Sequence, residues 1–368
     1  MSTDDLAETL RAAHPELEAV RRAAGEPVYL VGGGIRDLLL GRGRSDVDLV
    51  VVGNPMALAE RLGGTPVSTE ERFGTAKVEL DGHVVDIATA RTETYPHPGA
   101  LPVVEPVMDI EPDLARRDFT INAMAVRLGG EAELIDPHGG RDDLERGLLR
   151  ILHTDSFIDD PTRAIRAARY ASRLGFALEP ETERLLRATD LSAVSEDRRR
   201  AELLRLASES NGPDGLELLA EWELLDLREG GLDLARSVAT LLASKAWSGE
   251  AERAPALLAA AFGPNGGEAA LAAADPARPS EAVELAGART PVELVLARAL
   301  GAEWLDRYIE EWRSVALEID GSDLLAAGVA EGPALGRGLQ AALRRKLDGE
   351  ISGREEELAA ALAAAAER

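Results

Sequence analysis

The feature that most constrains this chain is a glycine-rich turn followed about ten residues later by two aspartates, within YLVGGGIRDLLLGRGRSDVDLVVVG (Tyr29 to Gly53). A short apolar run precedes the glycines at 32–34 and a helical stretch follows them, so the segment predicts strand, turn, helix and second strand. Asp46 and Asp48 are two residues apart, and residues i and i+2 of a strand point to the same face. The two carboxylates are therefore predicted side by side, about 6 to 7 Å apart along the strand.

Paired carboxylates beside a glycine-rich turn are typical of metal-dependent phosphoryl chemistry. Mg²⁺ is usually held by one or two carboxylates together with substrate phosphates, and glycine lets backbone N–H groups approach a phosphate closely. Arg36 adds a positive charge in the first turn of the helix. The simpler alternative is an ordinary strand-to-helix turn with both aspartates on a solvated face, but the apolar run Leu49 to Val52 disfavours it.

Two other glycine motifs do not fit this segment. The dinucleotide-binding fingerprint needs a third glycine where this chain has Asp37. The phosphate loop of common NTPases needs Gly-Lys-Ser/Thr, and the only lysine in the first 240 residues is Lys77.

The two halves of the segment, GGGIRDLLLG and SDVDLVVVG, resemble the signature of the tRNA nucleotidyltransferase and bacterial poly(A) polymerase family, the class II branch of the polymerase-β-like nucleotidyltransferases. Further segments resemble the family's other motifs in order and spacing: ARRDFTINAMAV (Ala115 to Val126), LIDPHGGRDDLERGLLR (Leu134 to Arg150), FIDDPTRAIRAARYASRLGF (Phe157 to Phe176) and VSEDRRRAELLRL (Val194 to Leu206). The resemblance covers about residues 28 to 206. It implies an α+β fold, in which a nucleotidyltransferase head with a mixed sheet is followed by an all-α neck, body and tail.

We expect three domains: a catalytic head over 1–138, a helical neck for base selection over 139–212, and a helical body and tail for tRNA binding over 213–368. In the head, the pattern of short β-rich runs predicts strands at Val28–Val31, Asp48–Val52, Lys77–Leu80, Val84–Ala88 and Ala123–Arg127. Residues 1–25 and Ala57–Leu62 are predicted helical, and from about 140 onward we expect helix alone.

The composition limits the partners and the location. The net charge is −25, which by itself argues against a nucleic-acid partner. Residues 141–210, however, contain 13 Arg and 14 Asp or Glu, so an RNA surface there would be local and built from arginine. The chain has no cysteine, its five histidines show no paired ligand spacing, and no apolar run reaches 18 residues. We therefore expect a cytoplasmic protein without a membrane partner.

Asp46 and Asp48 are the predicted ligands of Mg²⁺. Asp86, in the strand-like VVDIA, is a candidate third carboxylate and a candidate base for the ribose hydroxyl. A single aspartate in an inner strand is also commonly a structural acid, and both interpretations of Asp86 stay open.

The resemblance also implies how the nucleotide is held. Gly33 and Arg36 would contact the triphosphate, and Arg117 corresponds to the family's phosphate-binding arginine, with Asp118 and Asn122 supporting the site.

A helix predicted to start at Asp160 carries Arg163, Arg166 and Arg169 at steps of three, which wind around the helix instead of forming one stripe. By the resemblance, Asp160 and Arg163 read the incoming base, while Arg166 and Arg169 reach phosphates. Cytosine and adenine carry an amine on the edge that is read, whereas uracil and guanine place an oxygen there, so C and A would be accepted.

The charged run Glu196 to Arg200 has two interpretations. It either orients the neck or touches the tRNA backbone, or it is simply the start of a helix that Ser195 caps.

The function that the resemblance implies is addition of CMP and AMP, from CTP and ATP, to the 3′ end of tRNA without a template. Alternatives are an enzyme that adds only CC or only the terminal A, a poly(A) polymerase, and a non-catalytic RNA-binding scaffold. The segment Ala90 to Pro106 lies where the family keeps a flexible loop linked to switching from C to A.

Overall fold

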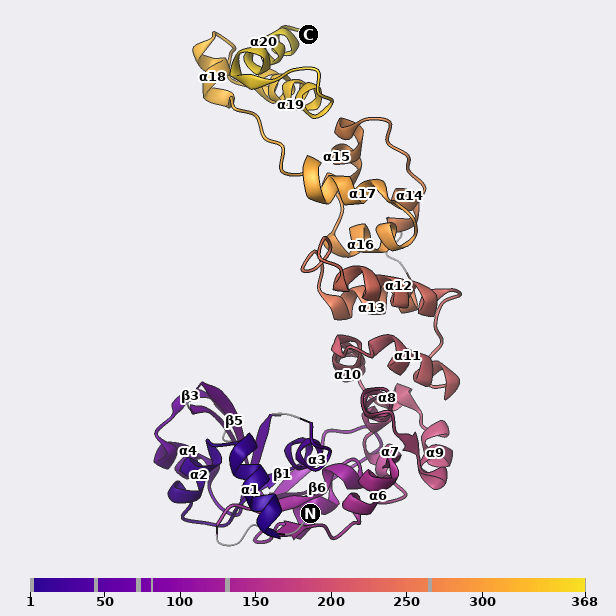
Figure 1. The fold of residues 1–368 in the computed structure, drawn as a ribbon. Coiled ribbons are helices and arrows are strands. Elements are labelled where there is room, and N and C mark those ends of the chain that lie inside the picture. The colour runs from indigo at the N-terminus through magenta and orange to yellow at the C-terminus, as the bar shows by residue number, and fades with distance from the viewer. Residues whose placement is uncertain are drawn as a thin grey trace. The chain divides into compact units, whose positions relative to one another are not determined.

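The computed structural model describes residues 3–42, 46–70, 74–80, 82–129, 133–263 and 267–367, and it divides into two compact units (Figure 1). The first unit comprises Met1–Leu225 and the second comprises Asp226–Arg368. The domain boundaries predicted at residues 138 and 212 both fall within the first unit, and they stay predictions.

A seven-stranded sheet with the order β3-β4-β5-β2-β1-β8-β9 forms the centre of the first unit. Its strands are β1 (Val28–Val31), β2 (Val47–Val51), β3 (Thr65–Glu70), β4 (Thr75–Leu80), β5 (His83–Thr89), β8 (Ala125–Arg127) and β9 (Leu134–Ile135). β2 pairs with β5 in parallel, and the other neighbouring strands are antiparallel. The predicted mixed sheet is therefore confirmed.

All five predicted strands are present, with ends shifted by at most two residues. The sequence pattern missed β3 at the sheet edge, where Val67 is 51% exposed and no apolar alternation marks the strand. It also missed β9 and a two-stranded antiparallel ribbon of β6 (Arg91–Thr94) and β7 (Val103–Pro106). The expectation of helix alone after residue 140 is wrong at β10 (Leu148–Leu149) and β11 (Ala177–Leu178), which are too short to leave a period-two pattern.

Helices cover the sheet and close its core. The predicted helix over 1–25 is two helices, α1 (Thr3–Ala13) and α2 (Leu17–Ala23), because Pro15 interrupts it. α4 (Pro55–Leu62) packs against α2, β4 and β5. All four residues of β1 are buried, as expected for a central strand with both faces covered.

The rest of the first unit is mainly helical. It contains α3 (Gly33–Leu39), α5 (Glu111–Ala115), η2 (Thr120–Asn122), α6 (Gly140–Arg146), α7 (Ser156–Asp159), α8 (Thr162–Leu174), α9 (Pro180–Arg187), η3 (Leu191–Ala193), α10 (Glu196–Ser208) and α11 (Gly212–Glu221). α8 starts two residues later than predicted and packs against α10 and α11. Its small residues Ala164, Ala167 and Ala168 are fully buried, which permits the close packing that the sequence predicts.

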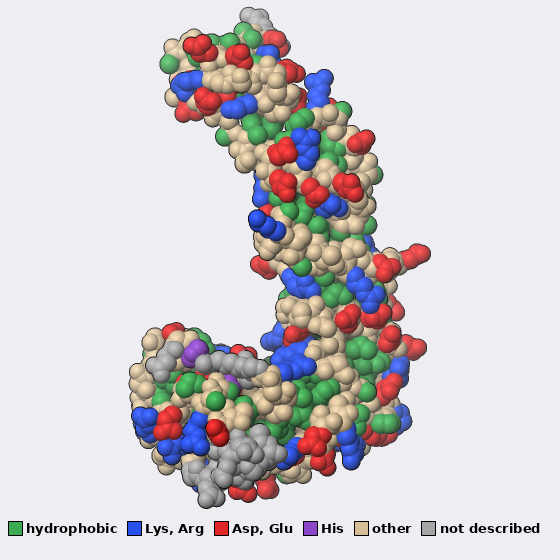
Figure 2. All heavy atoms as spheres, viewed as in Figure 1, with side chains coloured by type: hydrophobic (Ala, Val, Ile, Leu, Met, Phe, Trp, Pro, Cys, Tyr) green, Lys and Arg blue, Asp and Glu red, His purple; other side chains and the backbone are tan. Residues whose placement is uncertain are grey.

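The second unit is helical throughout its described residues, 226–263 and 267–367, as predicted for the body and tail. Its helices are α12 (Gly231–Ala243), α13 (Arg253–Phe262), α14 (Glu268–Ala272), α15 (Pro279–Gly287), α16 (Pro291–Ala299), α17 (Trp304–Arg307), η4 (Tyr308–Trp312), α18 (Gly321–Ala326), α19 (Pro333–Leu347) and α20 (Gly353–Ala366). Figure 2 shows basic and acidic side chains interspersed on the visible face of this unit. None of the described helices of the chain is long and apolar enough to cross a membrane.

Candidate active site

Three aspartates lie on or beside two neighbouring parallel strands. Asp46 directly precedes β2, Asp48 is the second residue of β2, and Asp86 on β5 is the register partner of Asp48. Val47 is only 2% exposed and points into the core, so the alternation of the strand turns the two flanking aspartates to the other face. Asp46 and Asp48 are thus turned to the same face although Asp46 lies just outside β2, and their role as metal ligands stays a prediction.

The electrostatics of this pair fit a divalent cation. Burial raises the pKa of Asp48 above its ordinary value. The positive charge of Arg117 opposes this shift, whereas the charges of Asp86 and Asp46 add to it. A cation beside these carboxylates would relieve the repulsion, and an all-oxygen donor set suits Mg²⁺. Within the described residues, no three His, Asp or Glu side chains converge into a complete site, so substrate oxygens would have to supply the remaining ligands.

Asp86 has a different partner. Its Oδ1 lies 2.6 Å from Nζ of Lys77 on the adjacent strand β4, and both side chains are well exposed. This ion pair favours the interpretation of Asp86 as a structural acid, while its role as a third ligand or base stays a prediction.

The glycine turn brings the backbone close to an arginine. Gly32 has a φ of +70°, which favours glycine, and a Cβ at this position would lie 3.0 Å from Nη1 of Arg117. Nη2 of Arg117 donates to Asp113 at 2.9 Å, and its buried Nε has no hydrogen-bond partner among the described residues. An oriented guanidinium with a free buried donor suits an anionic ligand.

Arg36 lies at the edge of the site, and its side chain is almost fully buried. Its Nε and Nη2 donate to both carboxylate oxygens of Asp37 at 2.9 and 3.0 Å, and its Nη1 donates to Oδ1 of Asn122 at 2.7 Å. The side chain is 3% exposed. These contacts join α3 to η2, and they hold the guanidinium of Arg36 close to Gly33.

Asp118 and Arg166 form an ion pair at the base of the site. Nε and Nη2 of Arg166 donate to Oδ2 of Asp118 at 2.9 and 2.5 Å. Oδ1 of Asp118 accepts from Asn122 Nδ2 at 2.9 Å and from the Phe119 N–H at 2.8 Å. Burial alone would raise the pKa of Asp118, but the charge of Arg166 and these hydrogen bonds hold it well below its ordinary value. The predicted supporting role of Asp118 and Asn122 agrees with this network.

The residues predicted to read the base lie together at the start of α8. Oδ1 of Asp160 accepts from the N–H and the hydroxyl of Thr162 at 3.1 and 2.6 Å. The buried guanidinium of Arg163 donates to Ser156 Oγ at 2.6 Å and to the carbonyl of Arg116 at 2.7 Å. Both side chains are thus held in fixed orientations before any ligand binds.

Tyr170 is the aromatic centre of the arginine cluster. The guanidinium carbons of Arg169, Arg36 and Arg166 lie 4.8, 5.3 and 5.9 Å from its ring centroid. Phe119 packs against the same ring edge-to-face at 5.9 Å. Cation–π contacts of this kind keep three positive groups near one another without neutralising them.

Two adjoining pockets open on this site and share Gly33, Asp48 and Tyr170. The larger, of about 680 Å³, is also lined by Arg36, Asp46 and Arg169, together with Arg42, His83 and Arg173. The smaller, of about 260 Å³, is also lined by Arg117, Asp160, Arg163 and Arg166, together with Glu93 and Tyr95. The predicted site residues therefore gather around a hollow made of these two adjoining pockets, and Asp86 alone among them lines neither pocket.

Sequence reasoning missed several side chains of this hollow. Tyr95 donates to Oε2 of Glu93 at 3.0 Å, and burial together with that carboxylate raises its pKa to about 12. Arg116, adjacent to the predicted Arg117, donates to Glu93 and to Asp113, both at 2.8 Å. Arg116 could have been found within the ARRD block, whereas nothing near Tyr95 in the sequence marks it as a site residue.

The segment Ala90 to Pro106, expected from the resemblance to be a flexible loop, contains the ribbon of β6 and β7. The loop between these strands, residues 95–102, packs against α7 and η3 through Gly99. Its backbone is thus tied to η3 and to α7, the helix that Asp160 directly follows.

Comparison with known protein families gives one match in this part of the chain. Residues 28–150 match the model described as the poly A polymerase head domain. These residues include β1, β2 and β5, together with the glycine turn and the three aspartates.

Individual relatives extend the match. The chain is 48% identical over 174 residues to an A-adding tRNA nucleotidyltransferase of Aquifex aeolicus. These residues cover 46% of this chain and 21% of the relative. The chain spans about a fifth to a half of the length of the A-adding relatives that it matches. A CC-adding tRNA nucleotidyltransferase of Deinococcus radiodurans is 34% identical over 359 residues, which cover 92% of this chain and 89% of the relative. A solved structure described as the complex of a CCA-adding enzyme with CTP is similar over 98% of both chains, with 28% identity and a TM-score of 0.77.

Proposed function

The chain belongs to the class II tRNA nucleotidyltransferase family, and from this premise we propose that it transfers CMP and AMP from CTP and ATP to the 3′ end of tRNA without a template. The observation that carries the proposal is a pair of adjoining pockets, one lined by two carboxylates that suit a metal and the other by an Asp-Arg pair that suits a base edge. The carboxylates are Asp46 and Asp48, and the pair is Asp160 and Arg163.

In the proposed reaction, the 3′-hydroxyl of tRNA attacks the α-phosphate of the nucleotide and pyrophosphate leaves in line. Mg²⁺ held by Asp46 and Asp48 would supply charge stabilisation for this transfer. Arg117 offers its free Nε–H to a phosphate oxygen, and Arg169 offers positive charge on the wall of the larger pocket. The protein's own contribution is therefore positioning and fixed positive charge.

We propose supporting roles for two arginines that the sequence placed on phosphates. Arg36 is engaged by Asp37 and Asn122, and Arg166 is engaged by Asp118. Arg36 links α3 to Asn122 in η2, and Arg166 links α8 to Asp118. Both guanidinium groups also contact the ring of Tyr170. Direct phosphate contact is proposed for Gly33, Arg117 and Arg169 instead. Asp113 and Glu209 pair with these two arginines, but the Nε of each has no hydrogen-bond partner among the described residues.

Base choice is proposed to depend on free atoms of Asp160 and Arg163. Oδ2 of Asp160 has no hydrogen-bond partner among the described residues, so it can accept from the exocyclic amine of cytosine or adenine. Arg163 uses two of the five donors of a guanidinium, and the others can donate to a ring nitrogen or carbonyl. Uracil and guanine would place an oxygen against Oδ2, which leaves polar groups unpaired.

Replacing Arg163 with alanine is expected to lower kcat/KM for CTP and ATP by about 100-fold and to reduce discrimination against UTP. The rate falls because the base loses the hydrogen bond that Arg163 would donate, whereas the proposed contacts of other residues with the triphosphate remain. Single-turnover incorporation of CTP, ATP and UTP measures both effects. Arg163→Lys serves as the comparison that keeps a charge, and an alanine variant with unchanged discrimination against UTP would contradict the assignment.

The proposed function is tested with three tRNAs that end before CC, after C and after CC, each given CTP, ATP or both with Mg²⁺. Growth of the shortest tRNA to full CCA would establish complete addition. Extension of only the CC-ended tRNA by ATP would identify an A-adding enzyme, and arrest at CC a CC-adding one. Long A tails would identify a poly(A) polymerase, and no incorporation would support a non-catalytic scaffold.

A further inference from the structure

One guanidinium on α10 joins the proposed base-reading acid to the loop between β6 and β7. Nη2 of Arg198 donates to Oδ1 of Asp160 at 3.0 Å. Nη1 of Arg198 donates to the carbonyl of Gly99 at 2.7 Å and lies 3.4 Å from that of Ala100. Arg198 thus contacts two parts of the first unit that are far apart in sequence, and its side chain is only 26% exposed.

The loop end of this link has little freedom to move. Gly99 has a φ of +69°, and a Cβ there would lie 2.2 Å from the carbonyl oxygen of Ala193 at the end of η3. The N–H of Gly99 donates to the carbonyl of Ile158 on α7 at 3.3 Å. Only glycine permits this close approach, so the loop backbone holds the Gly99 carbonyl in front of Arg198.

At the other end of this link, the two carboxylate oxygens of Asp160 differ in their hydrogen bonds. Oδ1 of Asp160 accepts hydrogen bonds from the N–H and hydroxyl of Thr162 and from Arg198, whereas Oδ2 accepts none from the described residues. The χ2 torsion of an aspartate is broad and readily turns without such restraints. Three donors on one oxygen therefore fix the orientation of the carboxylate and leave its other oxygen free to accept.

We propose that Arg198 is a positioning residue for base selection, which holds Asp160 through Oδ1 and couples its orientation to the loop between β6 and β7. This inference rests on the proposed function, because it concerns the same nucleotide site. The run Glu196 to Arg200 is the start of a helix, as one interpretation predicts, but Ser195 makes no side-chain cap hydrogen bond. Arg198 faces the site, so we do not propose it as a contact for the tRNA backbone.

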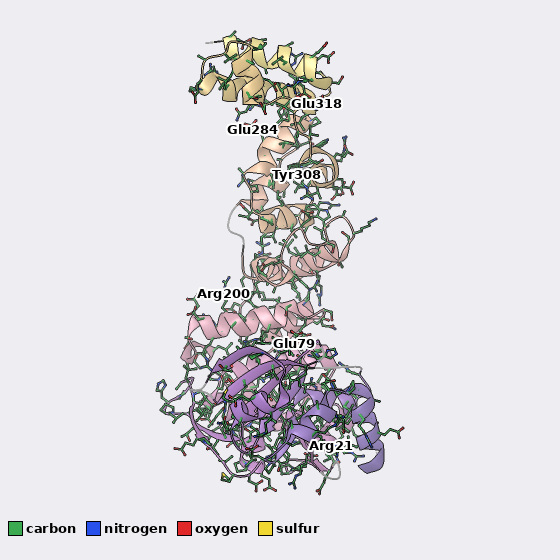
Figure 3. All side chains as sticks on the ribbon, turned by 90° about the vertical axis from the view of Figure 1, so that its left-hand side faces the viewer. Arg21, Glu79, Arg200, Glu284, Tyr308 and Glu318 are labelled. Atoms are coloured by element: carbon green, nitrogen blue, oxygen red, sulfur yellow. The ribbon has the colours of Figure 1, made fainter. Side chains whose placement is uncertain are left out.

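Arg200 provides a matched control on the same helix. It lies two residues further along α10, it is exposed, and Figure 3 labels it. Loss of Arg200 removes the same charge from the same helix without touching Asp160 or the loop. Any effect specific to Arg198→Ala therefore reports the link and not the net charge of α10.

The experiment compares wild-type protein with Arg198→Ala, Arg198→Lys and Arg200→Ala in single-turnover incorporation of CTP, ATP and UTP into truncated tRNA. Arg198→Ala is expected to lower discrimination against UTP by about 10-fold with an unchanged KM for tRNA, because a misplaced acid weakens base choice alone. Arg198→Lys is expected to recover part of the discrimination, and Arg200→Ala is expected to match the wild type. Unchanged discrimination, or a raised KM for tRNA as the main effect, would overturn the inference.

A second variant tests the link from the loop side and covers the case in which Arg198→Ala fails to fold. Gly99→Ala must push the loop away from Ala193, so it is expected to reduce discrimination against UTP although Arg198 and Asp160 are intact. Gly63→Ala is its control, since Gly63 also has a positive φ, of +65°, but has open space around it. Equal discrimination in Gly99→Ala and Gly63→Ala would overturn the coupling, while absence of incorporation by the wild type would refute the proposed function and this inference together.

Discussion

Replacing Asp48 with asparagine is expected to lower nucleotide incorporation by about 1,000-fold while leaving tRNA affinity nearly unchanged. The asparagine keeps the size of the side chain but loses the negative charge that would bind Mg²⁺. The tRNA-binding surface that we propose, on residues 213–368, does not include this strand, so the dissociation constant for tRNA should change little. Incorporation rates with Mg²⁺ and a separate tRNA-binding titration distinguish the two effects.

The same substitution should not destabilise the fold. Ionised Asp48 is partly buried and repelled by Asp46 and Asp86, so removal of its charge relieves an unfavourable interaction. We expect a melting temperature equal to or above that of the wild type in the absence of Mg²⁺. Glu79→Gln is a matched control, because Glu79 is an exposed acid on β4 of the same sheet (Figure 3) and lines neither pocket. Near-normal incorporation by the Asp48 variant would show that the metal assignment is wrong.

Replacing Asp118 with alanine is expected to lower the free energy of unfolding by about 2 to 3 kcal/mol, since it leaves the charge of Arg166 without its partner. The side chain of Asp118 is 5% exposed and that of Arg166 is 33% exposed, so water offsets part of the loss. Two donors, Asn122 Nδ2 and the Phe119 N–H, also lose their acceptor. Denaturant unfolding of both proteins at pH 7 measures the difference.

The pH dependence of this difference follows from the lowered pKa of Asp118. An acid whose pKa is lower in the folded state stabilises the fold above its unfolded pKa of about 4, and this stabilisation is lost as the pH falls further. The difference between wild type and Asp118→Ala should therefore be constant from pH 7 to pH 5 and should shrink below about pH 4. A difference that already shrinks between pH 7 and pH 5 would contradict the pairing with Arg166.

The local parts of the site could be predicted from the sequence. The strand β1, the turn at Gly32 and the placement of Asp46 and Asp48 depend on a few adjacent residues, and alternation along β2 is enough to orient both carboxylates. The start of α8 was predictable to within two residues, because Pro161 and the aspartate before it are strong helix-start signals.

The contacts that hold the site together could not be predicted in this way. Arg36 bonds to Asn122, 86 residues away, and Arg198 bonds to Asp160, 38 residues away. Such pairs depend on how the sheet and helices pack, which leaves no period or spacing in the sequence. For the same reason, phosphate contacts are expected from the sequence for Arg36 and Arg166, whereas in the structure both guanidinium groups donate hydrogen bonds to carboxylates.

Base selectivity of the wild-type protein tests the proposed function most directly. Each of CTP, ATP, UTP and GTP is supplied alone with Mg²⁺ to a tRNA ending before CC and to one ending after CC, and single-nucleotide addition is timed. We expect addition of C or A, the bases with an amine facing Asp160, with U and G at least about 100-fold slower on both tRNAs. Comparable rates for U or G, or no addition of any nucleotide, would contradict it.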